Sequence, residues 1–123
     1  MTCYLYPDLL GIRENMTKND LLQGTLDMMI LKALSRGALH GYAIARWFEH
    51  ATDDALRVEE GSLYPALYRM EERGWISSEW GLTERKRNAK FYKLTRLGRK
   101  QLEAETSSWE HLSGLVSKVM QTA

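Results

Sequence analysis

Positive charge gathers in one segment of this sequence, between Leu82 and Lys100. The segment holds eight basic residues and one acidic residue, Glu84, although the formal net charge of the 123-residue chain is only +1. The basic residues are Arg85, Lys86, Arg87, Lys90, Lys93, Arg96, Arg99 and Lys100. Such a patch is typical of a site that binds a polyanion such as a nucleic acid, and a merely solvated basic surface is the alternative.

Other reactive residue types are too few or too scattered to predict a catalytic or metal site. No two of the three histidines, His40, His50 and His111, are spaced three or four apart, and the single cysteine, Cys3, cannot complete a metal cluster. The sequence has no glycine-rich phosphate loop, no Gly-x-Ser-x-Gly turn and no His-Glu-x-x-His pair. We therefore expect no enzyme activity, no metal and no cofactor.

The composition is that of an ordinary soluble domain. Hydrophobic residues make up 44% of the chain and charged residues 27%. No apolar run is long enough to span a membrane, and no signal peptide is visible. A single cysteine fits the reducing cytoplasm. We expect a cytoplasmic protein that does not contact a membrane.

Three helices are expected ahead of the basic segment. Apolar residues spaced three and four apart predict one amphipathic helix over 20–35 and another over 41–51. A third helix is expected to begin near Ser62, a plausible N-cap, with Pro65 in its first turn and Gly74 at its end. His40 is expected to help start the second helix.

The hydrophobic period changes after the third helix. Alternating residues over 76–82 predict a strand, and 90–94 predicts a second one, so the polar residues between them form the basic tip of a β-hairpin. Thr95 is a good cap for a last helix that runs toward Met120. Its apolar residues form a heptad seam that a small domain cannot cover alone. The seam residues are Leu102, Trp109, Leu112, Val116 and Val119.

This order of elements is typical of a winged helix-turn-helix followed by a dimerisation helix. The expected fold is mainly α with a small β-hairpin, the wing. The third helix would enter the DNA major groove, while basic wing residues bind neighbouring phosphates. A two-fold dimer then presents two such helices to a pseudo-palindromic site in double-stranded DNA.

Three regions are therefore expected along the chain. Residues 1–19 form a flexible N-terminal arm, 20–95 the DNA-binding domain and 96–123 the dimerisation helix. Alternatively, residues 1–15 are an extension without a role of their own, ahead of a second possible start at Met16.

Four stretches carry a resemblance to a known family. They are Gly-Thr-Leu-Asp at 24–27, His-Gly-Tyr-Ala-Ile at 40–44, Glu-Gly-Ser-Leu-Tyr-Pro-Ala-Leu at 60–67, and Lys-Phe-Tyr-Lys-Leu-Thr at 90–95, followed by Gly98. From about Leu21 onward, the sequence thereby resembles the PadR-type transcriptional regulators. The resemblance implies a homodimeric DNA-binding regulator, usually a repressor, which some members release from DNA when a hydrophobic small molecule binds.

The resemblance and the pattern together predict the functional residues. The expected DNA contacts are Ser62, Tyr64, Tyr68, Arg69, Arg85, Lys86, Arg87 and Lys90, and Ser62 can alternatively serve only as a helix cap. The expected dimer interface comprises Leu26, Met29, Leu102, Trp109, Leu112, Val116 and Val119. Trp109 is either an anchor of this interface or, as the resemblance implies, a residue that stacks on a planar hydrophobic effector.

Two further groups of residues have simple structural expectations. Glu71 and Glu72 would be repelled by phosphate, so they are expected to point away from DNA or to pair with Arg73. Trp47, Trp75 and Trp80 are expected to pack in the core or against the hairpin.

The alternative function is a winged-helix interaction module whose basic wing binds an acidic protein. The operator, the regulated genes and the effector cannot be read from the sequence.

Overall fold

The structure is a computed structural model that describes the backbone of residues 18–123 and the side chains of residues 25–123. Residues 1–17, which hold Met16 and nearly all of the expected arm, lie outside the described part. The elements are α1 (Lys18–Ala33), a 3-10 turn η1 (Leu34–Arg36), β1 (Leu39–His40), α2 (Gly41–Ala51), α3 (Glu60–Glu72), β2 (Ile76–Leu82), β3 (Asn88–Leu94) and α4 (Arg96–Gln121). Lys18 and Asn19 therefore belong to the first helix rather than to the arm.

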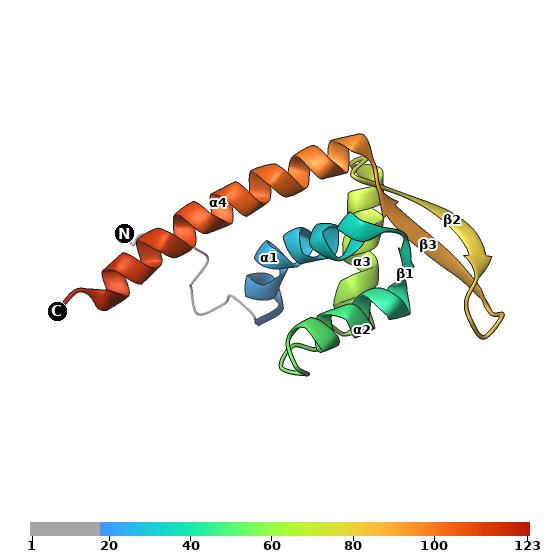
Figure 1. Cartoon of the computed structure of the whole chain (residues 1–123), viewed down its shortest axis with the longest axis horizontal. Coiled ribbons are helices and arrows are strands. Elements are labelled where there is room, and N and C mark those ends of the chain that lie inside the picture. Colours follow the sequence, from blue (N-terminus) through green and yellow to red (C-terminus); the bar gives the residue numbers. More distant parts are fainter. Residues whose placement is uncertain (1–17) are drawn as a thin grey trace.

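The mainly helical fold with a small β-hairpin is confirmed. Helices α1, α2 and α3 form a compact body, the β2–β3 hairpin projects from it as the wing, and α4 runs across the body and beyond it (Figure 1). The sequence had not indicated β1, which adds a third strand in the antiparallel order β1-β3-β2. Because His40 pairs with Phe91, the start of α2 lies beside the base of the wing.

The core forms where the three helices meet the base of the sheet. Leu63, Leu67 and Met70 recur at helical spacing on α3 and are buried, as expected. They pack in one cluster with residues of α1, α2 and both wing strands. Leu26, one of the residues expected at the dimer interface, is part of this cluster with 1% of its surface exposed. Its side chain is therefore already covered within the protomer.

The start of α3 differs from the expected one. The helix begins at Glu60, two residues before Ser62, and its N-cap residue Glu59 makes no capping hydrogen bond with its side chain. The cap expected of Ser62 is therefore wrong, because a residue inside the first turn cannot occupy the flanking cap position. At α2 the expectation is confirmed, since the Nδ1 atom of His40 accepts a hydrogen bond from the backbone N–H of Ala43 at 3.3 Å.

The start of α4 is fixed to the connection between α3 and β2. The Thr95 hydroxyl accepts a hydrogen bond from the N–H of Gly98 at 3.0 Å and donates one to the carbonyl of Gly74 at 2.6 Å. The N–H of Thr95 also donates to the carbonyl of Trp75. Gly98 is buried against this connection. These bonds set the direction in which α4 leaves the wing.

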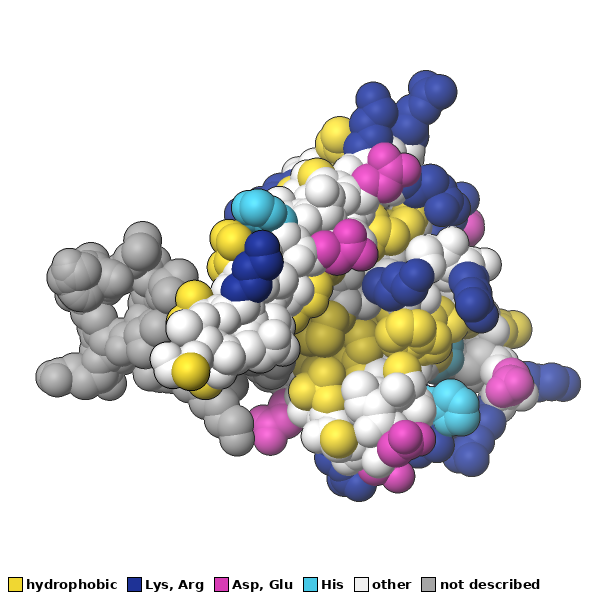
Figure 2. All heavy atoms as spheres, turned by 60° about the vertical axis from the view of Figure 1, so that its left-hand side comes forward, with side chains coloured by type: hydrophobic (Ala, Val, Ile, Leu, Met, Phe, Trp, Pro, Cys, Tyr) yellow, Lys and Arg dark blue, Asp and Glu magenta, His cyan; other side chains and the backbone are white. Residues whose placement is uncertain are grey.

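The second half of α4 extends past the body. Leu102 is half-buried and packs against the core. The other four seam residues, Trp109, Leu112, Val116 and Val119, are exposed and continue the same helical face. Figure 2 shows hydrophobic side chains gathered in the hollow between α4 and the rest of the body. Within the described residues 18–123, every helix is too short or too polar to span a bilayer.

Candidate nucleic-acid interface

A groove of about 930 Å³ separates the wing from the N-terminal parts of α2 and α3. Helix α2 contributes Tyr42 and Arg46, and α3 contributes Tyr64. On the wing side, the lining residues include Arg85, Arg87 and Lys90, and Glu84 is the one acidic residue among the described residues of the lining. The groove therefore combines aromatic side chains with an excess of positive charge, a pairing that suits a nucleic acid.

Tyr64 is held in the groove by its contact with a glycine. Gly41, the first residue of α2, is buried, and a Cβ atom added there would overlap the phenol ring of Tyr64. The missing side chain lets α3 approach the start of α2 closely enough for the ring to lie over the backbone. Tyr64 remains 42% exposed, so it is both positioned and accessible.

The other expected contacts of α3 lie outside the groove lining. Ser62 is half-buried and Tyr68 is exposed. A side-chain hydrogen bond with Glu72, together with the charge of that carboxylate, raises the pKa of Tyr68. The Tyr68 hydroxyl therefore lies beside a carboxylate of its own helix. Arg69 points to α1, where its Nη2 atom lies 2.8 Å from Oδ1 of Asp27, so it is the expected DNA contact that the geometry supports least.

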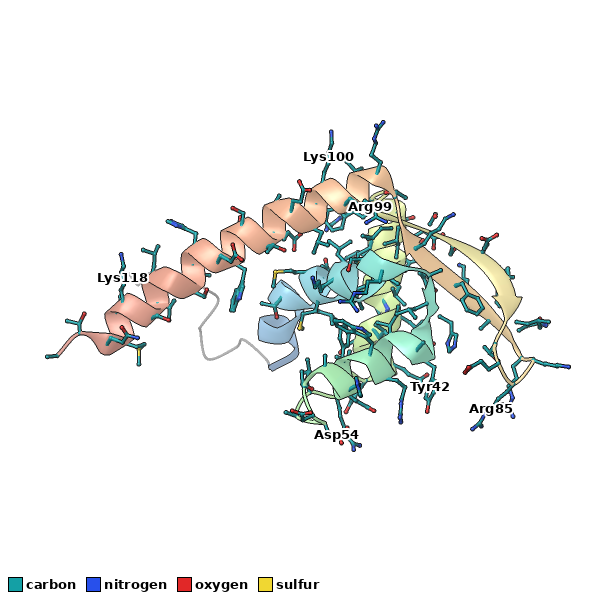
Figure 3. All side chains as sticks on the ribbon, viewed as in Figure 1. Tyr42, Asp54, Arg85, Arg99, Lys100 and Lys118 are labelled. Atoms are coloured by element: carbon teal, nitrogen blue, oxygen red, sulfur yellow. The ribbon has the colours of Figure 1, made fainter. Side chains whose placement is uncertain are left out.

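The tip of the wing is a tight, hydrogen-bonded turn. The N–H of Thr83 donates to the carbonyl of Arg87, and the N–H of Lys86 donates back to the carbonyl of Thr83. Lys86 takes a left-handed backbone conformation with φ of 60° and does not line the groove. All three basic side chains of the tip are exposed, and Figure 3 shows Arg85 and Tyr42 directed to the same side of the molecule. The turn thus presents its cations in a defined place.

Glu71 joins α3 to both strands of the wing. Its Oε2 atom accepts a hydrogen bond from the Ser78 hydroxyl at 2.6 Å, and its Oε1 atom lies 3.8 Å from Nζ of Lys90. Glu71 therefore pairs with the wing rather than with Arg73, and it does not line the groove. The guanidinium of Arg73 instead lies over the ring of Trp75. A phosphate that binds Lys90 would have to compete with Glu71.

Sequence reasoning missed three residues that line the groove. Tyr42 and Arg46 lie on the first turns of α2, a helix that was assigned no DNA contact. Trp80 is 71% exposed, so the expectation that it packs in the core or hairpin is wrong, whereas Trp47 and Trp75 do pack against the core. Alternation placed Trp80 on the inward face of β2, but it did not show that the body covers only the base of that face.

Comparison with known proteins gives the family. The pattern of the transcriptional regulator PadR-like family matches residues 30–104. An uncharacterized protein X of Lysinibacillus sphaericus is 24% identical over 106 residues, which are 86% of this chain and 97% of that protein. An uncharacterized 37.1 kDa protein in transposon TN4556 of Streptomyces fradiae is 42% identical over 89 residues, 72% of this chain but 24% of that longer protein.

Solved structures share the fold over most of the chain. A transcriptional regulator from Clostridium thermocellum has a TM-score of 0.73 and 29% identity, covering 80% of this chain and 96% of that one. A PadR-like regulator from Bacillus cereus has a TM-score of 0.72 and 29% identity, and the match covers 84% of this chain and 98% of that one. A PadR family regulator from Eggerthella lenta has a TM-score of 0.70 and 32% identity, and the match covers 85% of this chain and 88% of that one. This chain belongs to the PadR-like family of transcriptional regulators, which are DNA-binding winged helix-turn-helix proteins and not enzymes.

Proposed function

We propose that the protein is a homodimeric, sequence-specific repressor that binds a pseudo-palindromic operator. The groove carries this proposal, because it holds an accessible aromatic side chain of α3, Tyr64, opposite the cations Arg85, Arg87 and Lys90 of the wing. Tyr64 would contact base edges, and the wing would bind phosphates. The groove lining does not include Ser62, Tyr68 or Lys86, and Arg69 is the weakest member of the set.

The direct test compares two labelled duplexes by fluorescence anisotropy at several salt concentrations. One duplex is the region upstream of the protein's own coding sequence, and the other is a scrambled duplex of the same composition. The proposal expects tighter binding to the first and a steep fall of affinity with salt. Equal, weak binding to both would favour the alternative, in which the basic wing binds an acidic protein.

Tyr64→Ala is expected to lower the affinity for the operator about tenfold, with a much smaller loss for scrambled DNA. The reason is that a base-edge contact contributes only where the sequence matches. Tyr64→Phe keeps the ring over Gly41 and is the control for local packing. The assignment fails if Tyr64→Ala weakens both duplexes by the same factor in the anisotropy titrations.

The second half of α4 supports the homodimer. Trp109, Leu112, Val116 and Val119 form an exposed apolar stripe on a helix that no other described element covers beyond the body. Leu115 and Met120 are also exposed and widen the stripe, which the heptad pattern had not indicated. A second copy of α4 would bury it. Trp109 also offers its ring to a planar hydrophobic effector at this interface, whose binding would release the DNA.

Val116→Glu is expected to raise the dissociation constant of the dimer on the order of a hundredfold, because it places an unpaired charge in an apolar seam. Sedimentation velocity at micromolar concentration should then show a monomer. Ser107→Glu introduces the same charge nine residues earlier, on the opposite side of the helix, and should leave the dimer intact. A Val116→Glu protein that stays dimeric would place the interface elsewhere.

A further inference from the structure

The outer half of the wing carries an apolar surface as well as a basic tip. Trp80 is 71% exposed and Leu82 is 63% exposed, and both lie on β2. The register pairs Trp80 with Lys90 and Leu82 with Asn88, and directly paired residues share one face of a sheet. The two apolar side chains therefore lie on the same face as Lys90.

This face changes character along the strand. At the base of the wing it is part of the core, where Ile76 pairs with Leu94 and both are buried. Farther out, where the hairpin projects from the body in Figure 1, the same face turns into a wall of the groove that contains Tyr64 and Trp80. Trp80 is thus on the groove side of the wing and lies beyond the packing that buries Ile76 and Leu94.

The charge around Trp80 indicates what kind of partner would cover this surface. Arg46 lies across the groove on α2, and Arg85, Arg87 and Lys90 line its wing side together with Trp80. Glu84 is the one acid among the described lining residues, and Glu71, outside the lining, pairs with Lys90. A partner that covers this surface must therefore carry negative charge around an apolar part. The free half of α4 and the wing project from opposite ends of the body (Figure 1), so this surface is separate from the exposed apolar stripe of α4.

Double-stranded DNA has this combination of chemistry. Its phosphates are anionic, and the deoxyribose rings between them present apolar faces. We propose that Trp80, extended by Leu82, packs against the deoxyribose rings next to the phosphates that Arg85 and Arg87 bind. This inference rests on the proposed DNA-binding function and adds an apolar contact that is independent of base sequence. Trp80 would then strengthen binding to every duplex rather than select the operator.

Trp80→Ala is expected to weaken binding to the operator and to scrambled DNA by the same factor, about tenfold. The slope of log affinity against log salt should stay at the wild-type value, because a sugar contact releases no counterions. Trp80→Phe should keep most of the affinity. Leu97→Ala removes an exposed leucine at the start of α4, outside the groove, and should have no effect.

Fluorescence gives a second readout. DNA should change the tryptophan emission of the wild-type protein, and most of this change should be lost in Trp80→Phe. The proposal is overturned if Trp80→Ala binds DNA as the wild type does. It is also overturned if the salt slope flattens, since Trp80 would then only hold the wing cations in place. A wild-type protein that binds neither duplex would instead reject the proposed regulator itself.

Discussion

Gly98→Ala is expected to lower the free energy of unfolding by about 2 kcal/mol or more, although alanine is the better helix former. Gly98 lies in the first turn of α4, where an added Cβ would overlap the carbonyl oxygen of Trp75. That carbonyl accepts a hydrogen bond from the N–H of Thr95, so α4 cannot move away without breaking the bond. Urea unfolding followed by circular dichroism at a fixed protein concentration measures the loss.

Gly114→Ala is the matched control in the same helix. Among the described residues, nothing lies within 4 Å of a Cβ atom added at Gly114, so only the helix propensity changes. This variant should gain up to about 1 kcal/mol of stability, opposite in sign to Gly98→Ala. If both variants were stabilised, the close approach of α4 to the connection between α3 and β2 would not exist in solution.

The elements were predictable where local signals agree. The expected range 41–51 matches α2, because helical periodicity begins immediately after the His40 cap. Thr95 likewise marks the start of α4, because its side chain caps the helix by accepting a hydrogen bond from the N–H of Gly98. The start of α3 was misplaced because two local signals, the hydroxyl of Ser62 and the ring of Pro65, suggested a first turn two residues too late. In the structure the N–H groups of Ser62 and Leu63 donate to the carbonyl of Glu59, so the first turn is already formed ahead of Ser62.

The candidate site was less predictable, since it depends on distances across the fold. Glu71 could be assigned by sequence only as an acid that phosphate would repel. Its role in joining α3 to Ser78 and Lys90 follows from the angle of the wing. Similarly, periodicity places Leu26 on an apolar helix face, but only the packed structure shows that the protomer core buries it. The sequence shows which face of a helix is apolar, but which elements cover that face depends on how the helices and strands pack.

Arg85→Ala combined with Arg87→Ala is expected to weaken binding to operator and scrambled DNA alike, on the order of a hundredfold at moderate salt. Both arginines are exposed, line the groove and sit on the hydrogen-bonded turn that fixes the wing tip. A homodimer would lose about four phosphate contacts, so the slope of log affinity against log salt should become less negative by roughly 3 to 4. Anisotropy titrations over a range of salt measure both effects.

The control must separate local contact from overall charge. Arg99→Ala combined with Lys100→Ala removes the same two positive charges from the start of α4, at the opposite end of the wing from Arg85 (Figure 3). Neither residue lines the groove. Because exposed charges beyond about 10 Å are largely screened at moderate salt, this variant should keep its slope and most of its affinity. Equal losses in the two double variants would mean that DNA responds to the net charge of the protein, and the wing would lose its assigned role as the phosphate-binding element.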